Sequence, residues 1–217
     1  FLVGRNLSII YISNPTLGGF FRLEKGSSRG FLVVNTVGDP YADPVAGANA
    51  AADISEARLI ELVRASAGDM DLDVEIEGCA RWRCTSDVAE RLSERRIFLA
   101  GDSAHLMPPN GGFGGNTGIH DAHNLAWKLD LVLRGVAGPH LLDTYDTERR
   151  PVGRFTVDQA YARYVTRTAA YLQAKDAPPY EDDFKIELGY VYRSGAVLTE
   201  PGSPDKPLDP HESKGLP

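Results

Sequence analysis

Several residues that could bind a ligand or take part in a reaction lie close together between Arg95 and Leu129. The run "RRIFLAG" (95–101) is short and mostly apolar, as in a buried strand, and Asp102 follows it directly. In open α/β sheets ligands bind at the carboxyl edge of the strands, where a carboxylate can accept hydrogen bonds from sugar-like hydroxyls. The alternative is that Asp102 only caps the next turn, and Asp102 taken alone favours this alternative.

A loop rich in proline and glycine, "MPPNGGFGGNTG", follows. Pro108 and Pro109 hold the backbone extended and stiff. Glycines lack a Cβ, so a flat ligand could lie against the main chain; these are Gly111, Gly112, Gly114 and Gly115. A helix is predicted to begin at Asn116–Thr117, and its unpaired N–H groups would favour negative charge on a ligand. The alternative is a flexible surface loop with Asn116 as an ordinary N-cap.

Hydrophobic spacing predicts the elements before this stretch. Residues 1–40 alternate apolar and polar positions around the turn "KGSSRG", which predicts a hairpin or meander with one solvent-exposed face. After a loop at 38–53, "ISEARLIELVRASAG" predicts a helix with Ser55 as its N-cap and Gly68 as its stop. Alternation over residues 71–85 predicts a long strand.

The elements after the loop are mainly helical. Asn116–Arg134 is predicted to be a helix with one buried apolar face, formed by Ala122, Leu125, Ala126, Leu129, Val132 and Leu133. Residues 139–174 are predicted to be largely helical, with a break or kink at Pro151. One short strand is predicted near "GYVYRSGAVL".

Composition limits the classes of function. The chain has 217 residues, 42% hydrophobic and 24% charged, with a net charge of −7 and no basic run. This argues against a nucleic-acid or anionic-membrane surface. No apolar stretch approaches the length of a membrane span and no signal peptide is visible, so we expect a cytoplasmic protein. Cys79 and Cys84 are expected to be free thiols in a reducing compartment.

The segments "RIFLAGDSAH", "MPPNGGFGGNTGIHDAHNLAWKLDLVLRG" and "LLDTYDTERRPV" together resemble a known pattern. It is the second flavin-binding motif of FAD-dependent aromatic hydroxylases, the p-hydroxybenzoate hydroxylase-like or group A flavin monooxygenases. The branch that acts on phenols and aromatic polyketides is the most similar. The resemblance is strongest from Val88 to Val152.

The resemblance implies an α/β fold class, with an α+β arrangement in this fragment. It implies part of a Rossmann-like FAD-binding domain together with a β-sheet substrate domain. Residues 1–86 would be the substrate domain and residues 87–174 the C-terminal part of the FAD-binding domain. Residues 175–217 would be an extended tail leading to a further C-terminal region.

The resemblance also implies residue roles. Asp102 would hydrogen-bond the ribityl chain of FAD, and Pro108 would lie beside the isoalloxazine near its reacting C4a–N5 edge. The backbone N–H groups of Asn116 and Thr117 would face N1 and the C2 carbonyl. Gly101 and Gly115 would allow close approach, and Gly112 and Gly114 complete the predicted cofactor-binding set. The chain departs from the family at Phe113-Gly114-Gly115 and at His120.

The implied reaction is hydroxylation of an aromatic substrate with O2 and NADPH or NADH, through a flavin C4a-hydroperoxide. No side-chain nucleophile is required, and the protein must exclude water from the flavin. Phe20, Phe21, Arg22 and Trp82 are candidates for lining the substrate. For each of these aromatic residues, a place in the sheet core or in a cross-strand pair is the favoured alternative.

The family's N-terminal GxGxxG motif is absent from this sequence, since "GGFGGNTG" has Thr117 where the spacing requires glycine. We therefore expect an N-terminal FAD-binding portion in the same or another chain. The alternative is a degenerate, non-catalytic flavin-fold binding module.

Two other site types are weaker interpretations. Asp102, Ser103 and His105 are adjacent like a hydrolase triad, but triads form in space and no GxSxG motif is present. His120 and His123 lie one helical turn apart beside Asp121, but no second ligand cluster is evident, so no metal site is predicted.

Overall fold

The computed structural model describes residues 9–24, 29–43, 45, 47, 49, 53–198 and 202. The chain divides into two compact units. The first comprises Phe1–Arg83 and Thr168–Gln173, and the second Cys84–Arg167 and Ala174–Pro217. Among the helices within these described ranges, none has the length and apolar character needed to cross a membrane.

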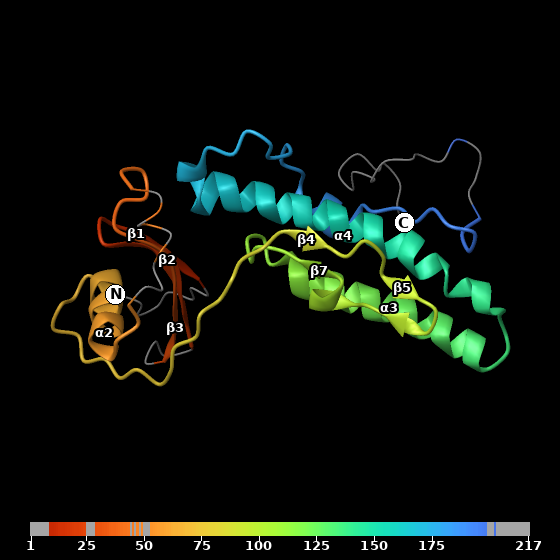
Figure 1. Cartoon of the computed structure of the whole chain (residues 1–217), viewed down its shortest axis with the longest axis horizontal. Helices are drawn as coiled ribbons and strands as arrows, with labels where there is room; N and C mark the ends of the chain where they lie inside the picture. Colours follow the sequence, from red (N-terminus) through yellow and green to blue (C-terminus); the bar gives the residue numbers. More distant parts are fainter. Residues whose placement is uncertain are drawn as a thin grey trace. The chain divides into compact units, whose positions relative to one another are not determined.

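The first unit contains a three-stranded antiparallel sheet (Figure 1). Its strands are β1 (Ile10–Ser13), β2 (Leu17–Leu23) and β3 (Gly30–Val37), in the spatial order β1-β2-β3. The Asn14 side chain accepts hydrogen bonds from the N–H groups of Thr16 and Leu17, which closes the β1–β2 turn. The predicted meander is confirmed over the described residues, while residues 1–8 and 25–28 of that prediction lie outside them.

The two faces of this sheet differ in exposure. Phe20 lies opposite Tyr11 on β1 and Val33 on β3, whereas Phe21 lies opposite Ile10 and Leu32. Successive strand residues point to opposite faces, so Phe20 and Phe21 lie on different sides of the sheet. Tyr11, which is 72% exposed, contacts Phe20 at 6.0 Å between ring centroids. The Phe20 face therefore presents aromatic rings at the surface.

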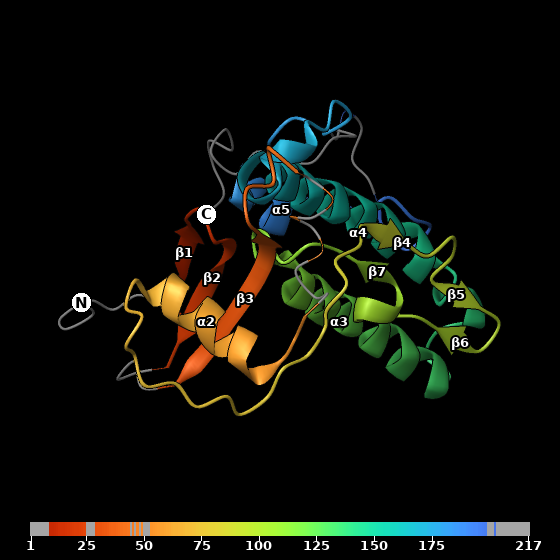
Figure 2. The ribbon, with the colours of Figure 1, turned by 60° about the vertical axis from the view of Figure 1, so that its left-hand side comes forward.

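The predicted helix after the sheet is confirmed as α2 (Glu56–Ala67), seen against the sheet in Figure 2. Ser55 occupies the N-cap position, although its side chain makes no capping hydrogen bond, and Gly68 ends the helix in the left-handed conformation. Leu62 is buried, and Asn14 Nδ2 donates to the Ala65 carbonyl at 3.0 Å. The β1–β2 turn is thereby tied to the C-terminal end of α2.

The predicted long strand over residues 71–85 is wrong. No strand forms between residues 71 and 86, and most side chains there are exposed. Alternation alone does not make a strand, because the backbone also needs a neighbouring strand for its hydrogen bonds. None of the described strands pairs with this stretch.

The second unit has two short antiparallel pairs. β4 (Asp87–Val88) pairs with β7 (His105–Leu106), and β5 (Ser93–Glu94) pairs with β6 (Ile97–Phe98). The predicted buried strand at 95–101 is thus reduced to the two residues of β6, with Ile97 exposed. A 3₁₀ turn, η1 (Gly101–Ser103), follows it.

Two long helices dominate this unit (Figure 1). They are α3 (Phe113–Leu133) and α4 (Thr144–Arg163), joined through a 3₁₀ turn, Pro139–Leu141. α4 runs without a break through Pro151. Pro151 removes only the hydrogen bond to the Thr147 carbonyl, and Thr147 lies exposed to water, which limits the cost. Of the predicted break or kink, the break at Pro151 is therefore wrong.

The chain continues from α4 as a π-helical turn, Tyr164–Thr168, and a 3₁₀ turn, Ala170–Leu172. Most of the predicted helix over 139–174 is thereby confirmed. A further short helix, α5 (Asp183–Leu188), contacts both α3 and α4. The strand predicted near residues 189–198 is wrong, because no strand is present there.

The buried face of α3 is polar, contrary to the prediction. Its buried residues are Phe113, Thr117, Asp121, Asn124 and Lys128. Members of the predicted apolar stripe, including Ala122 and Ala126, are exposed, and Leu133 is 82% exposed. Ile119 is 68% exposed on the same helix. α3 therefore packs against α4 mainly through charged and polar side chains. Of the predicted stripe, Leu125 is half-buried against the cluster of Leu92, Ala104 and Tyr145, and the residues named above lie at the surface.

One core cluster of the second unit consists of Leu92, Ala104 and Tyr145, with Phe98 and Leu99 packed against it. We expect Leu92→Ala to lower the free energy of unfolding by about 2–5 kcal/mol, because Leu92 is 0% exposed and its removal leaves a cavity. Leu188→Ala is the matched control, since Leu188 is 67% exposed. Urea denaturation would measure both, and equal losses would contradict this description of the core.

Candidate active site

The turn that carries Asp102 lies directly on α3. Gly101 begins η1 with a φ of 59°, and a Cβ added to Gly118 would lie only 3.2 Å from the Gly101 Cα. A side chain at Gly118 would crowd the Gly101 backbone, while Gly101 itself is favoured by its positive φ. The Asp102 side chain is exposed and makes no hydrogen bond to any described residue. Its carboxylate is therefore available to a ligand.

The start of α3 lies three residues before the predicted position. The helix begins at Phe113, and its N-cap, Gly112, has a φ of 73° and no side chain with which to cap the helix. The N–H groups without an intrahelical acceptor are then those of Phe113, Gly114 and Gly115. No acidic residue lies in the first turn. This end of α3 therefore offers backbone donors and a positive potential.

Asn116 and Thr117 differ from their predicted role. Their N–H groups lie within the hydrogen-bonding pattern of the helix, because α3 starts at Phe113. The Asn116 side chain donates to Glu187 Oε1 at 2.9 Å, and Thr117 Oγ1 donates to the Phe113 carbonyl at 2.8 Å. Neither side chain is left to bind a ligand.

The glycine loop fits a flat ligand. A Cβ at Gly112 or Gly115 would meet open space, and one at Gly114 would be in ordinary contact with Met107 at 3.6 Å. The exposed carboxylate suits a ligand with a polyol chain. The free backbone donors suit an electron-rich ring edge, and the open main-chain surface leaves room for a flat ring. The residues present therefore fit FAD.

The prediction for Pro108 needs correction on packing grounds. Pro108 is fully buried by protein atoms, whereas Pro109 is exposed. A ring with no exposed surface cannot lie against a bound isoalloxazine. If a proline of this loop contacts the cofactor, the exposed ring of Pro109 is the one that can do so.

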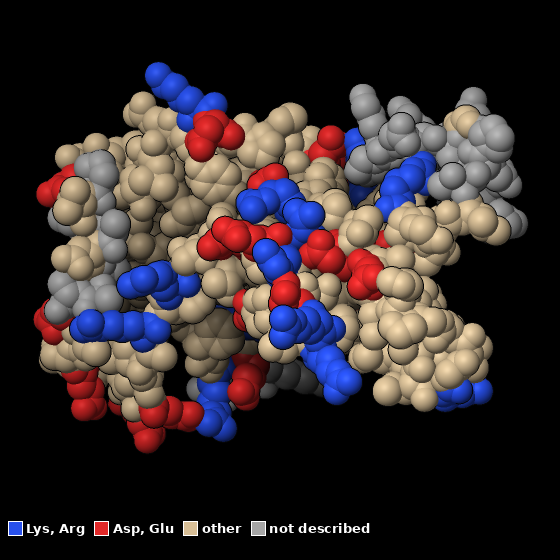
Figure 3. All heavy atoms as spheres, turned by 45° about the vertical axis from the view of Figure 1, so that its right-hand side comes forward, with Lys and Arg blue, Asp and Glu red and all other residues tan. Residues whose placement is uncertain are grey.

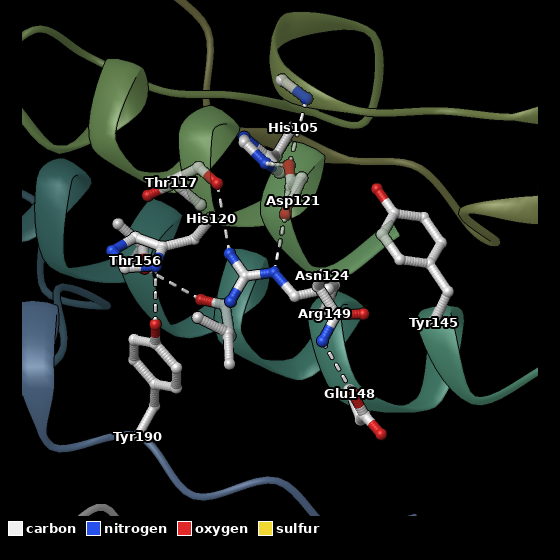
Figure 4. Close-up of polar contacts among 12 residues, drawn as sticks. His105, Thr117, His120, Asp121, Asn124, Tyr145, Glu148, Arg149, Thr156 and Tyr190 are labelled. Atoms are coloured by element: carbon white, nitrogen blue, oxygen red, sulfur yellow. Dashed lines mark hydrogen bonds and ion pairs between the residues drawn. The ribbon is translucent and has the colours of Figure 1, made fainter. Parts of the chain in front are cut away.

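A buried carboxylate, Asp121, joins η1, β7, α3 and α4 (Figure 4). Asp121 Oδ2 accepts the Gly101 N–H at 3.0 Å and bonds His105 Nε2 at 2.6 Å, while Oδ1 accepts Arg149 Nε at 2.8 Å. Arg149 also donates to the Thr117 carbonyl and to the Tyr192 hydroxyl. Asp121, His105 and Arg149 all have fully buried side chains.

A second buried cluster lies further along the interface between α3 and α4. Glu148 Oε2 accepts from Asn124 Nδ2 and from Lys128 Nζ, each at 2.7 Å, and Glu148 Oε1 accepts from Ser194 Oγ at 2.6 Å. None of these hydrogen bonds involves a residue of η1. The two helices are thus joined by two separate buried ion pairs.

The buried carboxylates stay ionised at neutral pH. Burial by itself would raise the pKa of Asp121, but hydrogen bonds from His105 and the charge of Arg149 outweigh it, so this pKa is lowered. Burial by itself would also raise the pKa of Glu148. The hydrogen bonds from Asn124 and Lys128 outweigh this effect, so the pKa of Glu148 is lowered.

The segment after residue 174 packs back onto α3 and α4. Buried Arg163 donates to the Glu181 carbonyl and pairs with Asp183 at 2.5 Å. The Tyr190 hydroxyl bonds His120 Nδ1 at 2.9 Å. Burial and the nearby Arg149 charge lower the pKa of His120, so this ring is neutral at pH 7. A cavity of about 70 Å³ lies between these elements, lined by His120, Arg149 and Tyr190 among others.

The contacts of Ser103 and His105 do not form a hydrolase triad. Ser103 Oγ donates to the Ala100 carbonyl at 2.8 Å, while the His105 ring is buried against Asp121. Within the described ranges, no group of three His, Cys, Asp or Glu side chains could hold a metal ion. Cys79 and Cys84 are free, as expected.

The predicted substrate-lining residues are not all on one surface. Phe20 and Arg22 share the exposed face of the first unit's sheet, and Phe21 lies on the other face. Trp82 is exposed but lies in the irregular stretch before β4. Only Phe20 and Arg22 are therefore brought together by the sheet.

Comparisons with known proteins identify the family of this chain. A family model described as an FAD binding domain matches residues 23–160. The chain belongs to this FAD binding domain family. The predicted resemblance is thereby confirmed. A 4-methyl-5-nitrocatechol 5-monooxygenase from a Burkholderia species is 51% identical, covering 100% of this chain and 40% of that protein. A putative polyketide hydroxylase from Streptomyces halstedii is 41% identical, over 95% of this chain and 37% of that protein.

Solved structures extend the family assignment to the fold. The ternary complex of aklavinone-11 hydroxylase with FAD and aklavinone matches with a TM-score of 0.78 and 33% identity, over 96% of this chain and 38% of that one. This confirms the predicted fold class, part of a Rossmann-like FAD-binding domain with a β-sheet region. The chain spans about two fifths of the length of these relatives.

Sequence reasoning missed the role of Asp121 and Arg149 and the polar face of α3. A signal was present, because Thr117, Asp121, Asn124 and Lys128 recur at helical spacing as regularly as the apolar residues. A polar stripe of this kind is usually solvated, so the apolar stripe was the expected core face.

The ion pair at Glu148 predicts a specific dependence on pH. A lowered carboxyl pKa stabilises the fold above the ordinary value of 4.5, and this contribution is lost as the pH falls below it. We expect Glu148→Gln to lose about 3 kcal/mol at pH 7, because buried Lys128 loses its counter-charge. The loss should shrink between pH 5 and about pH 3.

Urea denaturation at several pH values would measure this effect. Glu94→Gln is the control, since Glu94 is an exposed carboxylate that pairs only with exposed Arg91. A Glu148→Gln loss that is the same at every pH would contradict the ionised pair.

Proposed function

We propose that this chain is part of a flavin-dependent monooxygenase that hydroxylates an aromatic substrate, phenolic or polyketide-like, with FAD, NADPH or NADH and O2. One observation carries the proposal. The turn that bears exposed Asp102 lies on α3, and the start of this same helix is open and uncapped. Relatives named as a nitrocatechol monooxygenase and as polyketide hydroxylases support the substrate class.

Each part of this site has a physical role toward the cofactor. Asp102 accepts hydrogen bonds from the ribityl hydroxyls. The N–H groups of Phe113, Gly114 and Gly115, together with the positive helix end, stabilise negative charge at the pyrimidine edge of the ring. Pro109 lies against the ring in place of Pro108. When bound, FAD supplies the electron transfer and the activation of oxygen, and the protein supplies position and electrostatics.

We propose that residues 1–86 form the substrate domain and residues 87–174 the C-terminal part of the FAD-binding domain. The aromatic, exposed sheet face with Phe20, Arg22 and Tyr11 supports this assignment, since planar substrates stack on rings and pair with guanidinium groups. On the face of the molecule in Figure 3, acidic and basic side chains are interspersed, which favours a small molecule over nucleic acid as the partner.

We propose that a further FAD-binding portion, in the same or another chain, covers the exposed face of α3. Ile119, Trp127 and Leu133 lie exposed along this one helix, with Ala122 and Ala126 between them. Exposed apolar side chains along one helix are typical of a face that another element covers, here with the exposed polar residues His123 and Asp130 among them. The GxGxxG motif that this sequence lacks would belong to that portion.

The reaction is tested in the protein that carries this chain together with its covering portion. We expect the purified protein to be yellow, with a flavin absorption band, and an added aromatic substrate to stimulate NADPH or NADH oxidation. A protein that stays colourless in excess FAD would contradict the proposal and favour a non-catalytic binding module.

Asp102 gives a sharper test of the cofactor site. We expect Asp102→Ala to weaken FAD binding about 10- to 100-fold, the effect of losing charge-assisted hydrogen bonds, with little change in stability because Asp102 is exposed. Quenching of flavin fluorescence would measure the affinity. Asp130→Asn, another exposed carboxylate of the same unit, is the control; equal affinity in both variants would contradict the assignment.

Phe20 and Phe21 form a matched pair for the substrate face. We expect Phe20→Leu mainly to raise the KM for the aromatic substrate, several-fold, since its ring lies beside exposed Tyr11 on the proposed substrate face. Phe21→Leu should mainly lower stability, because its ring lies on the opposite face. Steady-state kinetics and thermal denaturation would separate them, and a reversed pattern would contradict the proposed substrate face.

A further inference from the structure

We propose that Asp121 is a positioning residue that holds Asp102 at a fixed place relative to the start of α3. This inference rests on the proposed flavin site. A ribityl chain at Asp102 and a ring edge at the first turn of α3 belong to one molecule, so covalent bonds limit the distance between them. The two protein elements that receive them come from different parts of the chain, so something must fix their spacing.

Asp121 makes the direct connection between these two elements. Its Oδ2 atom accepts the N–H of Gly101, the residue that precedes Asp102, at 3.0 Å. Asp121 itself lies on α3, two helical turns after Phe113. The turn that carries Asp102 is thus hydrogen-bonded to the same helix whose first N–H groups face the ligand.

The contact between Gly101 and Gly118 makes this connection short. A Cβ at Gly118 would lie 3.2 Å from the Gly101 Cα, so the turn rests on the helix backbone one turn before Asp121. The side chain of Asp121 can then reach the Gly101 amide without a water molecule between them. Any shift of the turn along α3 would break this hydrogen bond.

Arg149 and His105 hold the Asp121 carboxylate in place. Arg149 Nε binds Oδ1 at 2.8 Å, and Arg149 Nη2 donates to the Thr117 carbonyl at 3.2 Å. His105 Nε2 donates to Oδ2 at 2.6 Å, because an ionised carboxylate can only accept. Both oxygens are therefore fixed by donors from two further elements, α4 and β7.

The second buried ion pair provides the comparison that isolates this role. Glu148 also pairs with a buried cation across the interface of α3 and α4, but its partners are Asn124, Lys128 and Ser194, and none belongs to η1. Removing either carboxylate should weaken the packing of the two helices. Only the loss of Asp121 should free the turn that carries Asp102.

The test compares Asp121→Asn with Glu148→Gln in the full protein without added FAD. Hydrogen–deuterium exchange of the backbone amides at residues 99–104 reports the Gly101 bond directly. We expect exchange at Gly101 to rise about tenfold or more in Asp121→Asn, beyond any rise in Glu148→Gln at matched global stability. Equal exchange in the two variants would overturn the inference.

FAD affinity is the second readout, measured by fluorescence quenching under conditions where both variants are folded. We expect Asp121→Asn to bind FAD about tenfold more weakly than Glu148→Gln. Equal affinities would overturn the positioning role. If the unmodified protein binds no FAD, the proposed function fails, and the exchange measurement still decides whether Asp121 holds the turn.

Gly118→Ala keeps the inference testable should Asp121→Asn not fold. The added methyl would lie 3.2 Å from the Gly101 Cα and press on the turn, while the side chains of Asp121, His105 and Arg149 stay unchanged. We expect weaker FAD binding and faster Gly101 exchange, with Gly138→Ala as the control, since a Cβ at Gly138 meets open space. Unchanged binding and exchange in Gly118→Ala would overturn the inference.

Discussion

The buried carboxylate of Asp121 is the constraint on which the second unit depends. It lies with Arg149 and His105 where four elements meet, and all three side chains are fully buried. A buried charge is costly unless it is paired and hydrogen-bonded. A partial rearrangement of these elements would therefore leave the Asp121 carboxylate buried without its partners. The arrangement therefore admits one position for the turn of Asp102 on α3. A hydrophobic contact at the same place would tolerate sliding, whereas this network does not.

The same network explains why α3 is polar on its inner face and apolar on its outer face. The charged residues on the inner side, Asp121 and Lys128, pair with Arg149 and Glu148 on α4. Ile119, Trp127 and Leu133 are then left on the other side of the helix, where the described residues leave them exposed, while Leu125 packs against the core. We interpret the helix as the centre of a larger layered fold, polar toward α4 and apolar toward the portion that we propose covers it.

The fold class predicted from the sequence is confirmed, whereas the roles of Asp102 and the glycine loop stay predictions. Asp102 and the glycine loop stand out as candidates because their chemistry is local: a carboxylate after a short apolar run, and glycines before a helix. Element bounds were less accurate where they depend on distant partners. The alternation at 71–85 forms no strand, since no neighbouring strand pairs with it. The buried face of α3 was misassigned because the partners of Asp121 and Lys128 lie on α4, about a helix length further along the chain. The burial of Pro108 likewise depends on packing that spacing cannot reveal.

The central claim is that one molecule of FAD spans Asp102 and the first turn of α3. A crystal structure of the complete protein with bound FAD tests this most directly. The account predicts the ribityl hydroxyls within hydrogen-bonding distance of the Asp102 carboxylate and the pyrimidine edge of the ring at the backbone amides of Phe113–Gly115. An isoalloxazine bound elsewhere, with the amides of this helix end turned to solvent or to another protein segment, would contradict it.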